Sequence, residues 1–412
     1  MGIKVLFIGT CMPQPNNENM GPWALRQAQA FARAGIDLRV IRLTPWFPPG
    51  IRKLGPVRSV ADTPKRHLWG NVELEYLRWP FYAKGVLKRQ AHRNPWPQLR
   101  LAFALAKHSL LNIVSQFQPE AIYAHHTAVS GYVAYRLHQL TGTPYIVTDH
   151  DYDEIADCAN LPDRKRLFEA VQRSAAHVCD VSKRMSAIRS SVFRNIASQA
   201  VYNGADPLPA APLGRPRPPE IQGKLVVVCV SAWYGRKGIP KLIEAFDQVA
   251  NAFPNAVLRL VGDGPDRANV QAAVGAAKHG RQIQCVGMLP HDRAMQEMCW
   301  ADLYALIGRD EPFATTFSEA LMAGLPVIWP SDCGHAELLR DGEHGFSVPP
   351  WDVAATASAM SKLLADTALR KSMGTTNQAF AEAELTWDAN AAKMLAIFEA
   401  VNKQGQPRSL RG

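Results

Sequence analysis

The chain has 412 residues, of which 47% are hydrophobic and 20% are charged, and its formal net charge is +10. This length predicts two domains of roughly 200 residues each, and the composition excludes long disordered stretches. The longest apolar run, residues 225–232, is far shorter than the ~20 residues that span a bilayer. The seven cysteines are odd in number and lack C-x-x-C spacing, which argues against a disulfide framework or a structural zinc site.

The excess positive charge lies in the first quarter of the chain. Residues 1–110 hold 17 Lys and Arg against 5 Asp and Glu, whereas residues 211–412 hold 20 against 21. A cationic face attracts phosphates, nucleic acid or anionic lipid, and a solvated surface without a partner is the alternative. We expect a cytoplasmic protein, because the apolar residues 5–8 are too few for a signal peptide and fit a first buried strand.

Strands alternate with amphipathic helices through the first half of the chain. Strands are predicted at residues 4–9, 37–43, 121–124, 145–148, 178–181 and 201–202, and helices at residues 21–34 and 131–140. This βαβ order favours an α/β fold in which helices cover both faces of a parallel sheet.

A segment with six prolines, residues 206–223, is predicted to be an irregular, stiff linker. The βαβ order then resumes, with strands at residues 225–230, 257–261, 283–286, 303–306 and 327–328 and helices at residues 239–252 and 317–324. We therefore expect two Rossmann-like domains, residues 1–205 and 224–385, with a ligand-binding cleft between their strand edges. An amphipathic helix at about residues 386–404 is predicted to cross back and pack on the first domain.

Residues 76–100 interleave aromatic side chains with cations. The aromatic residues are Tyr76, Trp79, Phe81, Tyr82 and Trp96, and the cations are Arg78, Lys84, Lys88, Arg89, Arg93 and Arg100. This pattern is typical of a membrane interface or of a site for a pyrophosphate-lipid acceptor. A loop that packs its aromatic side chains inward is an equally good interpretation.

Two loops follow strands of the second predicted domain. Residues 231–238 precede a helix and include Arg236 and Lys237, so backbone N–H groups, the helix dipole and two cations predict a diphosphate site. An ordinary basic turn is the alternative. The turn Gly262-Asp263-Gly264-Pro265 allows the backbone to approach either a ligand or a neighbouring loop.

The strongest pattern places Glu311 and Glu319 around the start of a helix. Eight helical residues separate two backbone positions by about 12 Å, whereas glycosidase carboxylates that act on one carbon lie ~5–9.5 Å apart. The pair therefore suits the two ends of a long ligand, with the N–H groups of Thr315 and Thr316 at a phosphate between them. We expect a sugar at Glu311 and a ribose at Glu319; two solvated glutamates are the alternative.

Histidines follow two strands of the first predicted domain. His125 and His126 follow one strand, and His150 and Asp151 follow the next. A histidine at such a strand end can donate to a sugar hydroxyl or to a developing charge, although a purely structural histidine is the alternative. The four residues could converge on a metal ion, but no spacing demands one, and we expect none.

Taken in order, these segments resemble the retaining glycosyltransferases of family 4, which have the GT-B fold of two facing Rossmann-like domains with an interdomain cleft. The matching segments are Met20-Gly21, the strand ending at His125, Asp180-Val181-Ser182, Tyr202-Asn203-Gly204-Ala205-Asp206, Lys237-Gly238, Gly262-Asp263-Gly264-Pro265, residues 311–319 and Thr386-Trp387-Asp388. They cover nearly the whole chain. The opening loosely resembles members that build bacterial exopolysaccharide or cell-wall polymers.

The resemblance implies a role for each position. The implied catalytic residues are His125 near the reacting carbon, Lys237 at the leaving diphosphate and Glu311 at the donor sugar. The implied donor-binding residues are Gly21, Arg236, Lys237, Gly264, Glu311, Ala314, Thr315, Thr316 and Glu319, the last of these at the ribose hydroxyls. His126, His150 and Asp151 are candidates for acceptor binding. Several positions depart from the family pattern: Ser231-Ala232 replaces Gly-Arg, Ala314 replaces glycine, and Met20-Gly21 and Gly334-His335 each replace a Gly-Gly pair.

The family transfers a sugar from a nucleotide sugar, with UDP as the default nucleotide, to a hydroxyl and usually without a metal or other cofactor. The resemblance thus implies a saccharide or lipid-linked acceptor in polysaccharide or glycolipid biosynthesis, no nucleic-acid partner, and possible peripheral association with the inner face of the cell membrane. Two alternatives share the fold: a nucleotide-sugar 2-epimerase or phosphorylase, and a catalytically silent nucleotide-sugar-binding partner of a polymer-assembly complex.

Overall fold

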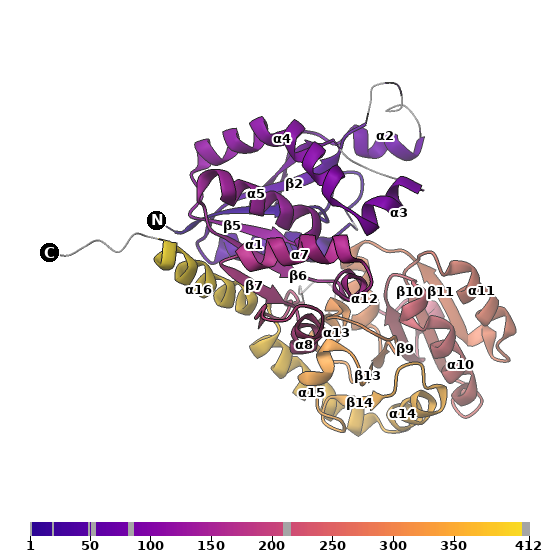
Figure 1. The fold of residues 1–412 in the computed structure, drawn as a ribbon. Helices are drawn as coiled ribbons and strands as arrows, with labels where there is room; N and C mark the ends of the chain where they lie inside the picture. The colour runs from indigo at the N-terminus through magenta and orange to yellow at the C-terminus, as the bar shows by residue number, and fades with distance from the viewer. Residues whose placement is uncertain are drawn as a thin grey trace. The chain divides into compact units, whose positions relative to one another are not determined.

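The computed structural model describes residues 2–18, 20–47, 50, 55–80, 86–208 and 216–405. The chain divides into two compact units (Figure 1). Unit 1 consists of Met1–Tyr202 with Trp387–Gly412, and unit 2 is Asn203–Thr386. No described helix is apolar over enough of its length to cross a membrane.

Unit 1 is built on an eight-stranded sheet with the order β3-β4-β2-β1-β5-β6-β7-β8. Its strands are β1 (Lys4–Gly9), β2 (Asp37–Pro45), β3 (Arg66–Trp69), β4 (Val72–Trp79), β5 (Ala121–His125), β6 (Tyr145–Asp149), β7 (His177–Asp180) and β8 (Gln199–Ala200). Neighbouring strands are parallel except for β3 and β4. The central strands are continuous apolar runs, as expected when both faces of a sheet are covered.

Helices cover both faces of this sheet. Phe31 of α1 (Pro22–Arg33) and Phe398 of α16 (Trp387–Gly405) lie in one core with alternate residues of the strands. The other core takes residues from α4 (Trp96–Phe117), α5 (Tyr132–Thr141) and α7 (Pro162–Ser174). The smaller helices are α2 (Gly55–Ala61), α3 (Val86–Arg93), α6 (Tyr152–Ala156) and α8 (Lys183–Val192). The prediction that the last helix belongs to the first α/β unit is confirmed.

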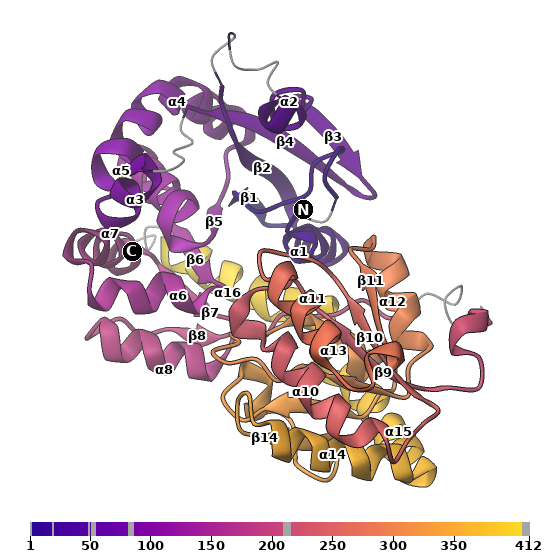
Figure 2. The same cartoon turned by 90° about the vertical axis from the view of Figure 1, so that its right-hand side faces the viewer.

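Unit 2 contains a six-stranded parallel sheet with the order β11-β10-β9-β12-β13-β14 (Figure 2). Its strands are β9 (Leu225–Val230), β10 (Ala256–Val261), β11 (Ile283–Gly287), β12 (Leu303–Ala305), β13 (Val327–Pro330) and β14 (Gly345–Val348). Its helices are α10 (Ile239–Ala250), α11 (Arg267–Ala276), α12 (His291–Cys299), α13 (Thr315–Met322), α14 (Val353–Ala365) and α15 (Thr367–Glu384). The predicted α/β class of both halves is confirmed.

Several local predictions need correction. The last strand of unit 1 is at residues 199–200, not 201–202. Residues 76–100 are not a loop, because their described part contains the end of β4, α3 and the start of α4, whereas residues 81–85 lie outside the described residues. Residues 209–215 of the predicted linker also lie outside the described residues. Within the rest of the linker, Pro219–Ile221 forms a 3-10 turn. Proline tolerates this geometry in a first helical turn because its fixed φ is close to the helical value.

Candidate functional site

The loop after β9 places two cations beside one carboxylate in unit 2. Gly235–Lys237 forms a short 3-10 turn, and Gly238 begins α10 with a φ of 68°. Nη1 of Arg236 lies 3.0 Å from Oε2 of Glu311, and Nζ of Lys237 donates a hydrogen bond to the same oxygen. Three residues that the sequence predicted at a donor site are therefore in contact.

This cluster retains positive charge inside the protein. Lys237 is 9% exposed and Glu311 is 5% exposed, so both groups are largely removed from solvent. One carboxylate faces two cations, and the excess charge favours an anionic ligand such as a diphosphate.

Helix α13 provides a second feature that favours anions. It begins after Ala314, which offers no side-chain cap, and its first turn contains no acidic residue. Thr315 and Thr316 are its first two residues, so the positive end of the helix dipole lies at the predicted phosphate position. The hydroxyl of Tyr304 donates to Oγ1 of Thr316 at 2.8 Å, which holds that side chain.

Glu319 lies one helical turn further on and is held by a histidine. Nε2 of His291, at the start of α12, lies 2.9 Å from Oε1 of Glu319. Glu319 thus has a different partner from Glu311, and the assignment of the two carboxylates to different parts of a ligand stays a prediction. His291 was not singled out from the sequence, because nothing in its local pattern distinguishes it from a surface histidine.

The glycines of the turn at residues 262–265 pack against the neighbouring loop. A Cβ atom added to Gly264 would lie 2.4 Å from the carbonyl oxygen of Trp233, and one added to Gly262 would lie 1.9 Å from that of Ser231. The backbone N–H of Trp233 also donates to the carbonyl of Asp263 at 2.9 Å. Of the two predicted reasons for these glycines, the close approach of a loop is therefore present, and a donor contact by Gly264 stays a prediction.

In unit 1, the histidines that follow β5 and β6 lie together. The rings of His125 and His150 stack with their centroids 3.8 Å apart. Burial lowers the pKa of both imidazoles well below the usual value, and the neighbouring His126 adds to this effect. Neither ring has a hydrogen-bond partner in the described part of the chain. Both side chains are thus neutral at pH 7 and can still donate or accept one hydrogen bond.

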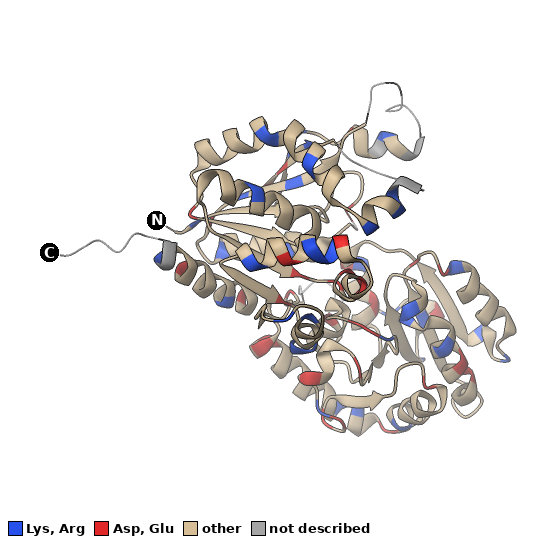
Figure 3. Ribbon diagram, viewed as in Figure 1, with Lys and Arg blue, Asp and Glu red and all other residues tan. Residues whose placement is uncertain are grey.

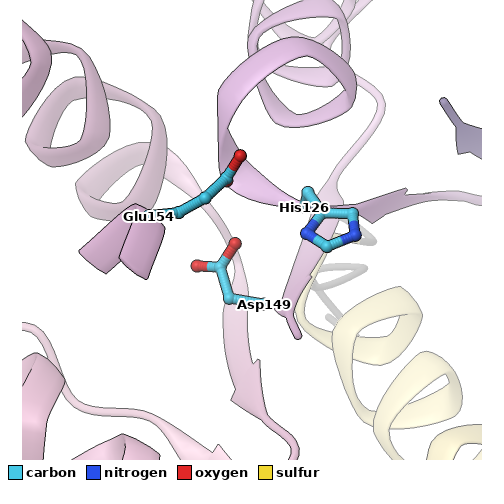
Figure 4. A group of neighbouring side chains, drawn as sticks. All are labelled: His126, Asp149 and Glu154. Carbon is cyan, nitrogen blue, oxygen red and sulfur yellow. The ribbon is translucent and has the colours of Figure 1, made fainter. Parts of the chain in front are cut away.

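His126 belongs to a different cluster, with Asp149 and Glu154 (Figure 4). One potential ligand atom from each lies within 4.8 Å of the others. Burial raises the pKa of Asp149, but the charge of Arg189 and a hydrogen bond from Thr127 outweigh it and lower the pKa overall. Arg189 donates to Oδ2 of Asp149 at 2.7 Å, and the N–H of Thr127 donates to Oδ1 at 2.7 Å. Both oxygens of Asp149 are therefore already bonded, whereas Nδ1 of His126 and Oε2 of Glu154 are buried without a hydrogen-bond partner among the described residues.

The structure also places Gly21 and Asp151. Gly21 has a φ of 63° and directly precedes α1, and an added Cβ would lie 2.4 Å from the carbonyl oxygen of Cys11. Asp151 is exposed at the start of α6. Its charge helps to raise the pKa of the Cys11 thiol, mainly raised by burial, to about 11. Cys11, Gly21 and Asp151 therefore belong to one neighbourhood at the carboxyl ends of the strands.

Residues 214–380 match the family described as Glycosyl transferases group 1. The chain is 25% identical over 371 residues to TuaC of Bacillus subtilis, which carries the name of a teichuronic acid biosynthesis glycosyltransferase; the match covers 87% of this chain and 89% of TuaC. It is 31% identical over 172 residues to a phosphatidyl-myo-inositol mannosyltransferase of Mycobacterium leprae, covering 41% of this chain and 45% of that protein. Apart from TuaC, the curated relatives are matched over only 15% to 58% of their own length.

Solved structures share the fold over nearly the whole chain. Sucrose-phosphate synthase from Thermosynechococcus elongatus has a TM-score of 0.77 at 19% identity, covering 98% of this chain and 100% of that one. HepE from Anabaena, solved in complex with UDP and glucose, has a TM-score of 0.68 at 17% identity and covers 97% of this chain and 100% of that one. The predicted GT-B fold is confirmed.

Proposed function

We propose that the protein is a retaining glycosyltransferase that moves a sugar from a nucleotide sugar to a hydroxyl acceptor, in keeping with the match of residues 214–380 to Glycosyl transferases group 1. The observation that carries this proposal is the cluster of Arg236, Lys237 and Glu311 in unit 2, where two cations face one largely buried carboxylate. A nucleoside diphosphate supplies the negative charge that this cluster and the start of α13 favour.

The same cations serve the chemistry. As the bond between the anomeric carbon and the diphosphate breaks, negative charge grows on the leaving phosphate, and Lys237 and Arg236 stabilise it. The acceptor oxygen forms the new bond on the same face, and its proton passes to a non-bridging oxygen of the leaving phosphate. Atoms and charge then balance without a protein nucleophile, and the anomeric configuration is retained.

In this scheme, unit 1 binds the acceptor. His125 donates one hydrogen bond from its neutral ring to the sugar, and His126, His150 and Asp151 contact the acceptor. Burial lowers the pKa of His125 and His150, so each neutral ring has one nitrogen that can donate a hydrogen bond and one that can accept.

The acceptor is proposed to be a saccharide or lipid-linked saccharide in polysaccharide or glycolipid biosynthesis. Two relatives have names that refer to teichuronic acid biosynthesis and to phosphatidyl-myo-inositol, which favours such an acceptor. Helices α3 and α4 carry Lys and Arg and no Asp or Glu (Figure 3). On α4, Leu101 and Leu105 are 63% and 64% exposed. Exposed leucines beside cations suit a peripheral contact with anionic lipid.

Calorimetric titration with UDP, GDP and ADP, in buffer that contains EDTA, tests the donor assignment. We expect UDP to bind best, because HepE, which shares the fold, was solved with UDP, and we expect EDTA to have no effect. Binding of none of the three by folded protein would contradict the proposal. Binding without transfer to any saccharide acceptor would instead favour the silent partner, and conversion of the donor alone into an epimer would favour the epimerase.

A further inference from the structure

Arg42 is a buried cation that has no anionic partner among the residues that the structure describes. It lies on β2 and is 3% exposed. Its Nη2 lies 3.0 Å from Sδ of Met20, and among the described residues neither Nε nor Nη1 has a hydrogen-bond partner. A thioether is a weak acceptor, and the Arg42 guanidinium also lies over the Tyr76 ring, 6.0 Å from its centroid. Neither contact supplies the negative charge that a desolvated guanidinium requires.

The groups around Arg42 do not supply the missing charge. Those that act most on it are Tyr76 and Cys11, and burial raises the pKa of each, that of Cys11 to about 11. Both are therefore neutral at pH 7. Burial lowers the pKa of Arg42 itself only to about 10, so the guanidinium stays charged.

Other arginines of the chain show what is unusual here. On the same strand, Nη2 of Arg39 lies 2.8 Å from Glu75. The buried Arg259 bonds to Glu297, and the buried Arg189 bonds to both Asp149 and Asp180. The buried Arg370 has no carboxylate but donates to the backbone carbonyls of Leu363 and Leu364, whereas Arg42 has the sulfur of Met20.

The chain next to Met20 favours an anion at the same place. Gly21 follows Met20 and directly precedes the 12-residue helix α1, which has no side-chain cap and no acidic residue in its first turn. The positive end of a helix dipole and an unpaired guanidinium therefore act on one neighbourhood. Met20 is 36% exposed, so an entering ligand can reach its side chain and displace it from Arg42.

We propose that Arg42 binds an oxyanion, a phosphate or a carboxylate, which enters beside the start of α1 and replaces the Met20 thioether on the guanidinium. If the protein transfers sugars as proposed above, this oxyanion belongs to the acceptor. Unit 1 would then select acidic acceptors, because a neutral acceptor leaves Arg42 unpaired.

The test compares Arg42→Met with the matched control Arg39→Met from the same strand. Inorganic phosphate, and separately glucuronate, is added at constant ionic strength while thermal unfolding and calorimetric binding are followed. We expect phosphate to raise the unfolding temperature of the wild-type protein and to bind Arg42→Met at least about tenfold more weakly, since a charge-assisted hydrogen bond is lost.

The two variants should differ in stability as well as in binding. Without phosphate, Arg42→Met should unfold at the same temperature as the wild type or higher, because an unpaired buried charge has been removed. Arg39→Met loses an ion pair and should be no more stable than the wild type, yet it should keep its phosphate response. A response to phosphate alone supports a phosphorylated acceptor, and a response to glucuronate as well supports oxyanions generally.

The inference is overturned if wild type and Arg42→Met respond equally to phosphate, or if neither anion affects the wild type. UDP binding by Arg42→Met distinguishes this failure from failure of the proposed function. If the wild-type protein does not bind UDP, the proposed donor site is wrong. If both proteins bind UDP normally and Arg42→Met keeps the phosphate response of the wild type, only the role of Arg42 is wrong.

Discussion

Lys237 and Glu311 form an ion pair inside unit 2, although they come from loops 74 residues apart in the chain. The pair holds the Lys237 ammonium at a fixed position instead of leaving it on a mobile stem. Arg236 contacts the same carboxylate, so the three groups behave as one cluster, and a change in any of them affects stability as well as ligand binding.

We expect Lys237→Ala to lower kcat for sugar transfer by about 10²–10³-fold, because one preorganised stabiliser of the leaving charge is lost. The same substitution should also destabilise unit 2, because it breaks the buried ion pair with Glu311. Removing one partner of a buried ion pair lowers the free energy of unfolding by about 3–5 kcal/mol. Because Arg236 still neutralises Glu311 in this variant, we expect a smaller decrease of about 1–3 kcal/mol. Steady-state kinetics and chemical unfolding measure the two effects.

The control is Lys241→Ala, which removes a cation from the exposed pair with Glu244 on α10. This variant should keep both activity and stability. Near-normal kcat/KM in Lys237→Ala would contradict the assignment of this lysine to the diphosphate.

The assignment of Glu319 to the ribose predicts a selective loss of affinity. Glu319→Gln should bind UDP about tenfold more weakly, since a hydrogen bond to a charged group is worth about 1.5–3 kcal/mol, but it should bind inorganic pyrophosphate normally. His291→Ala should weaken UDP binding less, because in this assignment His291 acts only by orienting the Glu319 carboxylate through its Nε2. Calorimetry with both ligands measures this difference, and an equal loss for pyrophosphate would place Glu319 at the phosphates instead.

Because His335 is buried, we expect the free energy of unfolding of unit 2 to fall as the pH is lowered. Burial lowers its pKa from 6.5 to about 3, and its ring stacks on Phe313 and bonds to the hydroxyl of Ser318. Below pH 6.5 the unfolded chain binds a proton that the folded chain excludes, so the free energy of unfolding falls by about 1.4 kcal/mol per pH unit between pH 6.5 and 3.

Chemical unfolding at pH 7 and pH 5 measures this dependence. His335→Gln should show a smaller decrease between the two pH values than the wild type, whatever its absolute stability. The exposed His108→Gln serves as the control and should keep the wild-type decrease. An unchanged decrease in His335→Gln would show that this ring is not the group that resists protonation.

The proposed lipid contact predicts salt-sensitive binding to vesicles that contain anionic phospholipid. Removal of the exposed Arg89 and Arg93 should weaken co-sedimentation with such vesicles, because each cation near an anionic surface contributes about 1 kcal/mol. The double variant Lys278→Ser and Arg281→Ser in unit 2 lowers the net charge equally and should bind as the wild type does. Equal binding by both double variants would exclude α3 as the contact.

Local periodicity and turn chemistry were enough to predict most of the fold. Buried parallel strands such as Val5-Leu6-Phe7-Ile8 and Val226-Val227-Val228 are continuous apolar runs, and this signal needs no tertiary information. Three strands were not predicted. Strands β3 and β14 are edge strands of four residues each, and β4 alternates charged with apolar residues instead of forming an apolar run. Strand β8 was predicted two residues too far along the chain. The position of α16 could be predicted in outline because its apolar face required a partner.

The residue types of the candidate site also came from the sequence, because Lys237, Glu311 and Glu319 follow or begin recognisable elements. The partners of these residues could not be predicted from the sequence. That Lys237 pairs with Glu311, that His291 holds Glu319, and that Arg42 lies buried against Met20 are consequences of which strand ends meet at one edge of a sheet. Sequence alone determined which groups this protein carries at its strand ends, and only the tertiary structure decided which charges are paired, because pairing depends on distances between segments far apart in the chain.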